Sequence, residues 1–161
     1  MKLAAGVAPV PAMLKAGVAV GLGTDGSASN NDVDMWEEID TAAKLHKLIS
    51  KDPTVLNAKQ ALEMATIRGA AAIHQEKEVG SLEAGKRADV IIVDMSSTHQ
   101  TPVYNVYSQL VYATKAADVQ TVVINGKIVM ENRRVLTVDS RQVESKANFY
   151  RDQIVKSINA K

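Results

Sequence analysis

The chain has 161 residues, enough for one domain or for one domain and part of another. Its formal net charge of +1 comes from 19 basic and 18 acidic residues spread along the chain, so we expect neither nucleic acid nor membrane as a partner. No apolar run approaches the roughly 20 residues that span a bilayer. Without cysteine the chain has no disulfide and no thiolate metal ligand. Because Met1–Gly6 lacks the form of a signal peptide, we expect a cytoplasmic protein.

The first half of the chain alternates helical and extended patterns. Apolar residues at helical spacing predict a short helix over 7–16, followed by Gly17. The nearly continuous apolar run at 18–23 predicts a parallel strand that is buried on both faces. Capping residues and apolar stripes predict helices over 34–51 and 57–73. This order indicates the α/β class, yet a lone parallel strand needs neighbours that this region does not supply.

The second half is richer in β-forming residues, and the composition changes near residue 78. Two β-rich runs flank Asn125-Gly126, which predicts a hairpin with a type I′ turn. We therefore divide the chain into residues 1–78 and residues 79–161. The other elements predicted in the second part are a strand over 89–94, a helix over 104–113, an extended piece over 134–138 and a final helix over 140–159 capped by Ser140.

Asp25 is the leading candidate for a functional residue. It follows the predicted strand directly, and in α/β barrels the groups at the carboxyl ends of the strands carry the chemistry. The competing interpretation is that Thr24-Asp25-Gly26 is a turn in which Asp25 bonds its own backbone. Three isolated histidines, with no HxH or HExxH spacing, do not supply a complete zinc site. For His46 and for Trp36 on the same helix we expect packing roles.

Several motifs together resemble one enzyme family, the metal-dependent amidohydrolases. The resemblance covers essentially the whole chain and is strongest to the branch of 5-methylthioadenosine/S-adenosylhomocysteine deaminases and related chlorohydrolase-like enzymes. Its motifs are Gly23-Thr24-Asp25-Gly26, Ser29-Asn30-Asn31-Asp32, Ala65-Thr66-Ile67-Arg68-Gly69, the run from Gly80 to Ile92, and Val123-Ile124-Asn125-Gly126.

The resemblance implies a fold larger than this chain. It implies a (β/α)8 barrel with a small β-sandwich, of which residues 1–78 are the end of the barrel, with 18–23 as its eighth strand. Residues 79–161 are then a partial β-sandwich with a C-terminal helix. Because a whole barrel takes about 250 residues, we expect this chain to be the C-terminal fragment of such an enzyme.

The resemblance also implies a reaction, the hydrolytic deamination of a purine nucleoside of the adenosine type. Asp25 is then both a ligand of a divalent metal, zinc or iron, and the catalytic group that takes a proton from the metal-bound water. Ser27, Asn30 and Asn31 orient the loop or touch the substrate. The family's metal-binding histidines and its catalytic glutamate have no counterpart here, so we expect this chain alone to bind no metal, to be inactive and to form homo-oligomers.

Two alternatives to that interpretation remain open. In the first alternative, the chain is a non-catalytic module without a metal site, in which the hairpin and the final helix mediate self-association and Asp25 is structural. In the other alternative it derives from a related amidohydrolase that acts on a triazine, guanine or cytosine-like ring.

Overall fold

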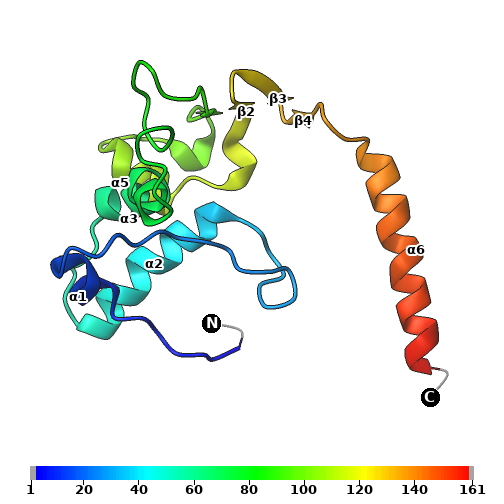
Figure 1. Ribbon diagram of the computed structural model, residues 1–161, viewed down its shortest axis with the longest axis horizontal. Helices are drawn as coiled ribbons and strands as arrows, with labels where there is room; N and C mark the ends of the chain where they lie inside the picture. The colour runs from blue at the N-terminus through cyan, green and yellow to red at the C-terminus, as the bar shows by residue number, and fades with distance from the viewer. Residues whose placement is uncertain (1–2, 160–161) are drawn as a thin grey trace.

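The computed structural model describes residues 3–159 and combines a helical layer, an antiparallel sheet and a helix that stands apart (Figure 1). The helices are α1 (Val10–Lys15), α2 (Met35–Ser50), α3 (Ala58–Met64), α4 (Ile67–Ala72), α5 (Val106–Tyr112) and α6 (Ser140–Asn159). The strands are β1 (Val90–Val93), β2 (Val119–Ile124), β3 (Lys127–Glu131) and β4 (Arg134–Val135), and two 3-10 turns are η1 (Thr98–Gln100) and η2 (Ala116–Asp118). Over residues 3–159, no helix is long and apolar enough to cross a membrane.

Side-chain caps define where α2 and α3 begin. The Asp34 carboxylate accepts a hydrogen bond from the Trp36 amide and caps the start of α2. Asn57 and Gln60 form a reciprocal capping box at the start of α3. These interactions involve neighbours in the sequence, so the sequence alone predicts them.

The hydrophobic core lies where α2, α3 and α5 meet. Ile39 and Ala43 from α2 pack with Met64 from α3 and Val111 from α5. The Trp36 indole Nε1 donates to the carbonyl of Leu110 at 2.6 Å and so ties α2 to α5. The packing roles expected for Trp36 and for the buried His46 are confirmed. Burial lowers the pKa of His46, because the charged imidazolium is poorly solvated there.

The single helix predicted over 57–73 is wrong, because it breaks into α3 and α4. At Thr66 the backbone leaves the helical region, with φ −130° and ψ −106°. The Thr66 hydroxyl donates to the Leu62 carbonyl at 2.8 Å, beside the bond that this carbonyl accepts from the Ala65 amide.

The strand predicted over 18–23 is also not formed. This run is an extended segment that leads from α1 toward the loop before α2 (Figure 1). It forms no β-ladder with another segment among residues 3–159. A strand is defined by its hydrogen-bonded neighbours, and within residues 3–159 no strand lies beside this run. The eighth strand of a barrel is therefore absent from the described fold, and the domain boundary near residue 78 stays a prediction.

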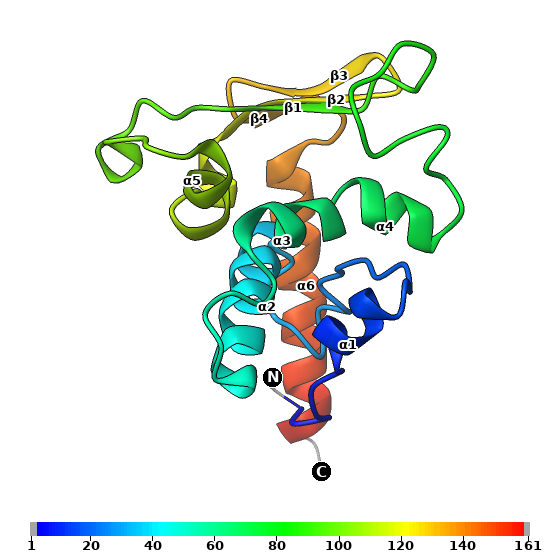
Figure 2. The same ribbon diagram turned by 90° about the vertical axis from the view of Figure 1, so that its left-hand side faces the viewer.

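The second half folds into one four-stranded antiparallel sheet in the order β1-β2-β3-β4. The hairpin prediction is confirmed, since β2 and β3 pair directly and Asn125 and Gly126 between them have φ of 49° and 75°. The partial β-sandwich is not seen as such, because residues 3–159 form this single sheet and no second one packs on it. The sheet forms a separate layer above α3, α4 and α5 in the view of Figure 2.

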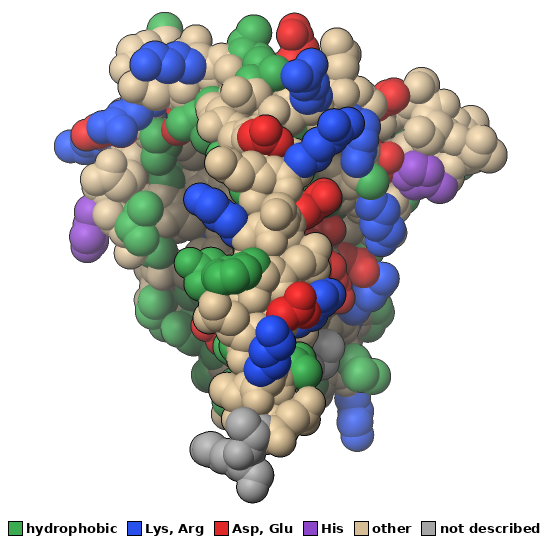
Figure 3. All heavy atoms as spheres, turned by 90° about the vertical axis from the view of Figure 1, so that its right-hand side faces the viewer, with side chains coloured by type: hydrophobic (Ala, Val, Ile, Leu, Met, Phe, Trp, Pro, Cys, Tyr) green, Lys and Arg blue, Asp and Glu red, His purple; other side chains and the backbone are tan. Residues whose placement is uncertain are grey.

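Helix α6 stands apart from the rest of the molecule (Figure 1) and buries none of its residues. Its predicted extent is confirmed, but its cap is Asp139 rather than Ser140. The Asp139 carboxylate accepts hydrogen bonds from the amides of Arg141 and Gln142 at 3.0 and 3.3 Å. The face that carries α6 mixes acidic, basic and apolar side chains (Figure 3).

Three glycines, Gly21, Gly69 and Gly80, allow chain segments to approach closely. A Cβ added to Gly21 would lie 3.0 Å from the Cα of Gly69. A Cβ added to Gly80, which has φ +90°, would lie 2.8 Å from the Cβ of Ala70 and 2.9 Å from the Cα of Ile67. The segment before β1 is thereby pressed against α4.

We predict that Gly80→Ala destabilises the fold much more than Gly85→Ala. Gly85 has a matching φ of +92° but open space around its Cα, so its variant carries only the backbone strain of about 1–2 kcal/mol. The Gly80 variant adds an overpacking cost of about 1–3 kcal/mol. Urea unfolding of both variants measures the difference, and equal losses of stability would contradict the close packing of Gly80.

Candidate functional site

Asp25 follows the extended segment of residues 18–23 and lies in the loop that leads to α2. Its φ is +60°, a left-handed conformation that aspartate adopts more readily than most residues. One carboxylate oxygen accepts from the Gly26 amide at 2.8 Å, and the other accepts from the Ser29 hydroxyl at 2.6 Å. The loop thus fixes the orientation of the carboxylate, while Asp25 itself stays exposed.

These hydrogen bonds also set the charge state of Asp25. The bond from Ser29, followed by the bond from the Gly26 amide, lowers the pKa of the Asp25 carboxyl below its ordinary value. Asp25 is therefore an anion at neutral pH. Ser29 was present in the sequence motif but not singled out, and its spacing of four residues from Asp25 is the signal that points to this bond.

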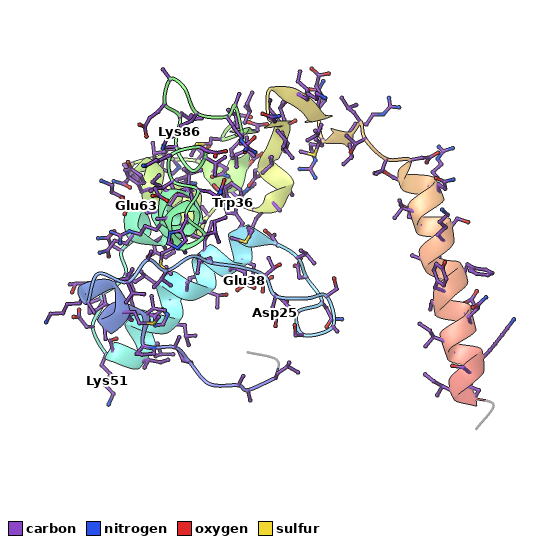
Figure 4. The ribbon with its side chains drawn as sticks, viewed as in Figure 1. Asp25, Trp36, Glu38, Lys51, Glu63 and Lys86 are labelled. Carbon is purple, nitrogen blue, oxygen red and sulfur yellow. The ribbon has the colours of Figure 1, made fainter. Side chains whose placement is uncertain are left out.

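A pocket of about 340 Å³ surrounds Asp25 and is rich in acidic side chains. Glu37 and Glu38, from the first turn of α2, line it together with Asn30. The Asn30 side chain donates to Glu38 at 2.7 Å and holds the loop on α2, which accords with the orienting role expected for Asn30. Asp25 and Glu38 lie toward the side of the helical layer that faces α6 (Figure 4).

The acidic groups in this region interact with one another. The nearby charge of Asp32, with smaller effects from burial and from Glu38, raises the pKa of Glu37. Such a concentration of negative charge favours a cation or a proton donor over an anionic ligand.

The described residues supply only part of a metal centre. A catalytic zinc site normally has three protein ligands and one open position. Over residues 3–159, no group of three or more His, Cys, Asp or Glu side chains is placed to hold a metal ion. Asp25 could be one ligand, but this donor set alone does not fit a catalytic zinc or iron.

The remaining polar candidates do not join Asp25. His46 lies in the helical core, and His74 follows the end of α4. A separate polar cluster, which the sequence did not predict, joins η1 and η2. There the buried Asp118 carboxylate accepts from His99 and from Gln100, both at 2.9 Å. Because these groups are partnered within the cluster and link elements of the fold, we assign the cluster a structural role.

The motifs and the loop that presents Asp25 define a class of protein. The model of the amidohydrolase family matches residues 1–129, which is most of the chain. The chain therefore belongs to the amidohydrolase family. Helix α6 lies beyond the matched residues.

Curated relatives narrow the comparison to nucleoside deaminases. The chain is 51% identical over 160 residues to the 5'-deoxyadenosine deaminase of Methanosarcina acetivorans, covering 99% of this chain and 37% of that protein. It is 54% identical over 143 residues to the 5-methylthioadenosine/S-adenosylhomocysteine deaminase of Moorella thermoacetica, covering 89% of this chain and 33% of that protein. The chain thus spans about a third of the length of these relatives.

Solved structures agree with this assignment. A zinc-bound adenosine deaminase from Xanthomonas campestris superimposes with a TM-score of 0.94 and 41% identity, over 96% of this chain and 35% of that one. The atrazine chlorohydrolase TrzN from Arthrobacter aurescens, complexed with zinc, gives a TM-score of 0.80 and 29% identity, over 89% of this chain and 32% of that one.

We predict that Ser29→Ala raises the pKa of the Asp25 carboxyl toward its ordinary value. The Ser29 hydroxyl is the largest cause of the lowered pKa, so its removal withdraws the main stabilisation of the anion. A pH titration of the Asp25 carboxyl carbon by NMR measures the change. Ser27→Ala is the matched control, because among residues 3–159 the hydroxyl that donates to the Asp25 carboxylate is that of Ser29. Identical titration curves in the two variants would contradict this assignment.

Proposed function

We propose that this chain is one third of a nucleoside deaminase whose remaining residues complete the catalytic site. The reaction is the hydrolysis of the C–N bond to the amino group of an adenosine-type purine, in which a C–O bond forms and ammonia leaves. The observation that carries the proposal is an identity of about half with deaminases over nearly the whole chain, together with the ionised Asp25 carboxylate at a pocket.

Asp25 has the properties that the proposed reaction requires. It is exposed at the pocket, it is an anion at neutral pH, and two hydrogen bonds hold its carboxylate in place. A positioned carboxylate of this kind can accept a proton during hydrolysis. The same carboxylate is the ligand that this chain contributes to the divalent metal, zinc or iron, whose other ligands belong to the rest of the protein. We place the function of the complete protein in the cytoplasm.

A chimaeric enzyme tests this proposal. This chain replaces the matched region of the Methanosarcina acetivorans 5'-deoxyadenosine deaminase, and ammonia release from 5'-deoxyadenosine is measured with zinc present. We expect turnover in the chimaera and a loss of about 100- to 10000-fold in its Asp25→Asn variant, the range for a lost proton-transfer group.

Asp52→Asn is the matched control for Asp25→Asn. Like Asp25, Asp52 is a carboxylate that accepts from a hydroxyl and from a backbone amide, here both of Thr54, but it lies outside the pocket. Its variant should keep full activity. A folded chimaera without turnover, or full activity after Asp25→Asn, would contradict the proposal. Circular dichroism separates these outcomes from misfolding.

A further inference from the structure

Glu38 lies in the first turn of α2, half-buried beside the loop that carries Asp25. Its carboxylate accepts the hydrogen bond from the Asn30 side chain at 2.7 Å. Among residues 3–159 Glu38 forms no salt bridge, so this carboxylate is bound to the loop rather than to a cation. Figure 4 shows Glu38 on α2 and Asp25 in the adjoining loop.

Helix α2 is a firm support for this bond, because the helix is fixed to the hydrophobic core. Ile39, which follows Glu38 in the sequence, is 3% exposed, and Ala43 one turn later is fully buried. The bond from the Trp36 indole to the Leu110 carbonyl adds a polar link to α5. A group that Glu38 holds is therefore held in place relative to the core.

A continuous series of hydrogen bonds leads from Asn30 to Asp25. The Asn30 backbone amide donates to the Gly26 carbonyl at 2.8 Å, and the Ser29 hydroxyl donates to the same carbonyl at 2.9 Å. The Gly26 amide and the Ser29 hydroxyl in turn donate to the two oxygens of the Asp25 carboxylate. A shift of Asn30 would therefore displace both donors that orient Asp25.

The loop is not held in this arrangement by burial. Within residues 25–33 only Ser29 and Asn30 are half-buried, and the other residues are exposed. The φ of +60° at Asp25 is also unfavourable for a residue with a Cβ. The turn thus needs a support outside itself, and the bond to Glu38 supplies one.

A second approach of the loop to α2 does not supply this support. It brings Asp32 near Glu37, and the charge of Asp32 raises the pKa of Glu37. Two like charges repel each other when both are ionised, so this approach pushes the loop away from the helix. The bond between Asn30 and Glu38 opposes that repulsion.

We propose that Glu38 is a positioning residue for Asp25. Through Asn30 and the turn that begins at Gly26, Glu38 fixes the direction of the Asp25 carboxylate relative to the core. The consequence for catalysis rests on the proposed deaminase activity, whereas the consequence for the order of the loop does not. The proposal is therefore tested by one measurement on the chain itself and by one on the chimaera.

Amide hydrogen exchange of the chain, followed by NMR, tests the order of the loop. In Glu38→Ala the amides of Gly26 and Asn30 should exchange about tenfold faster, which is the effect of one lost hydrogen bond. Glu38→Gln removes the charge but keeps an oxygen that accepts from Asn30, so it should exchange within about twofold of the unmodified chain.

Asp40→Ala is the matched control for Glu38→Ala. Asp40 lies on the same helix and accepts from Lys44 at 2.6 Å, but its partner belongs to α2 itself, and Asp40 does not line the pocket. This variant should leave the exchange of Gly26 and Asn30 unchanged.

Kinetics of the chimaera test the consequence for Asp25. Glu38→Ala should lower kcat by about 10- to 100-fold, because a misdirected catalytic group costs rate, and KM should stay within about twofold. Glu38→Gln should restore at least half of kcat. Asn30→Ala should reproduce the loss, and the double variant should lose no more than either single variant, since both changes remove the same bond.

Three outcomes would overturn the positioning role of Glu38. They are unchanged exchange in Glu38→Ala, equal losses in Glu38→Ala and Glu38→Gln, and losses in Asn30→Ala and Glu38→Ala that add in the double variant. Faster exchange in Glu38→Ala alone, in a chimaera that folds but shows no turnover, would support the positioning role and contradict only the proposed function.

Discussion

One constraint shapes the structure: the extended apolar segment of residues 18–23 has no neighbouring strand among residues 3–159. The run is apolar enough for a buried parallel strand, yet its neighbours in residues 3–159 are helices. Val20 and Leu22 pack against the core, and the Leu22 amide donates to the Met64 carbonyl at 3.2 Å. Backbone groups without partners are costly once buried, so this run stays at the surface.

The missing strand also affects the candidate site around Asp25. Residues 18–23 lead directly to Asp25, so whatever pairs with the run also fixes the position of the carboxylate. The loop already holds the carboxylate through Ser29 and Gly26, and it is anchored on α2 through Asn30 and Glu38. The orientation of Asp25 is therefore a property of this chain, whereas over residues 3–159 no group of three or more His, Cys, Asp or Glu side chains is placed to hold a metal ion.

The comparison of sequence and structure separates local from non-local interactions. The Asn125-Gly126 hairpin and the starts of the helices that Asp34 and Asn57 cap were predicted, because the interacting groups are close in the sequence. The strand at 18–23 was not formed, because pairing requires a neighbour that no local pattern supplies. The break at Thr66 depends on its own backbone conformation and on a hydroxyl bond, which apolar periodicity does not register.

The same distinction between local and non-local interactions applies to the candidate site. The strand-to-loop pattern singled out Asp25, and the motif resemblance led to the family that the comparisons bear out. The hydroxyl of Ser29 and the cluster around Asp118 were missed, because each is defined by side-chain geometry rather than by residue type.

Hydrogen exchange at residues 18–23 tests the central claim most directly. In the chain alone, the Val20 amide should exchange nearly as fast as in an unstructured peptide, since it has no backbone partner within residues 3–159. In the chimaera that joins this chain to the remaining two thirds of the relative, the same amide should be strongly protected by strand pairing. Unchanged fast exchange in a folded chimaera, or strong protection already in the chain alone, would contradict the account.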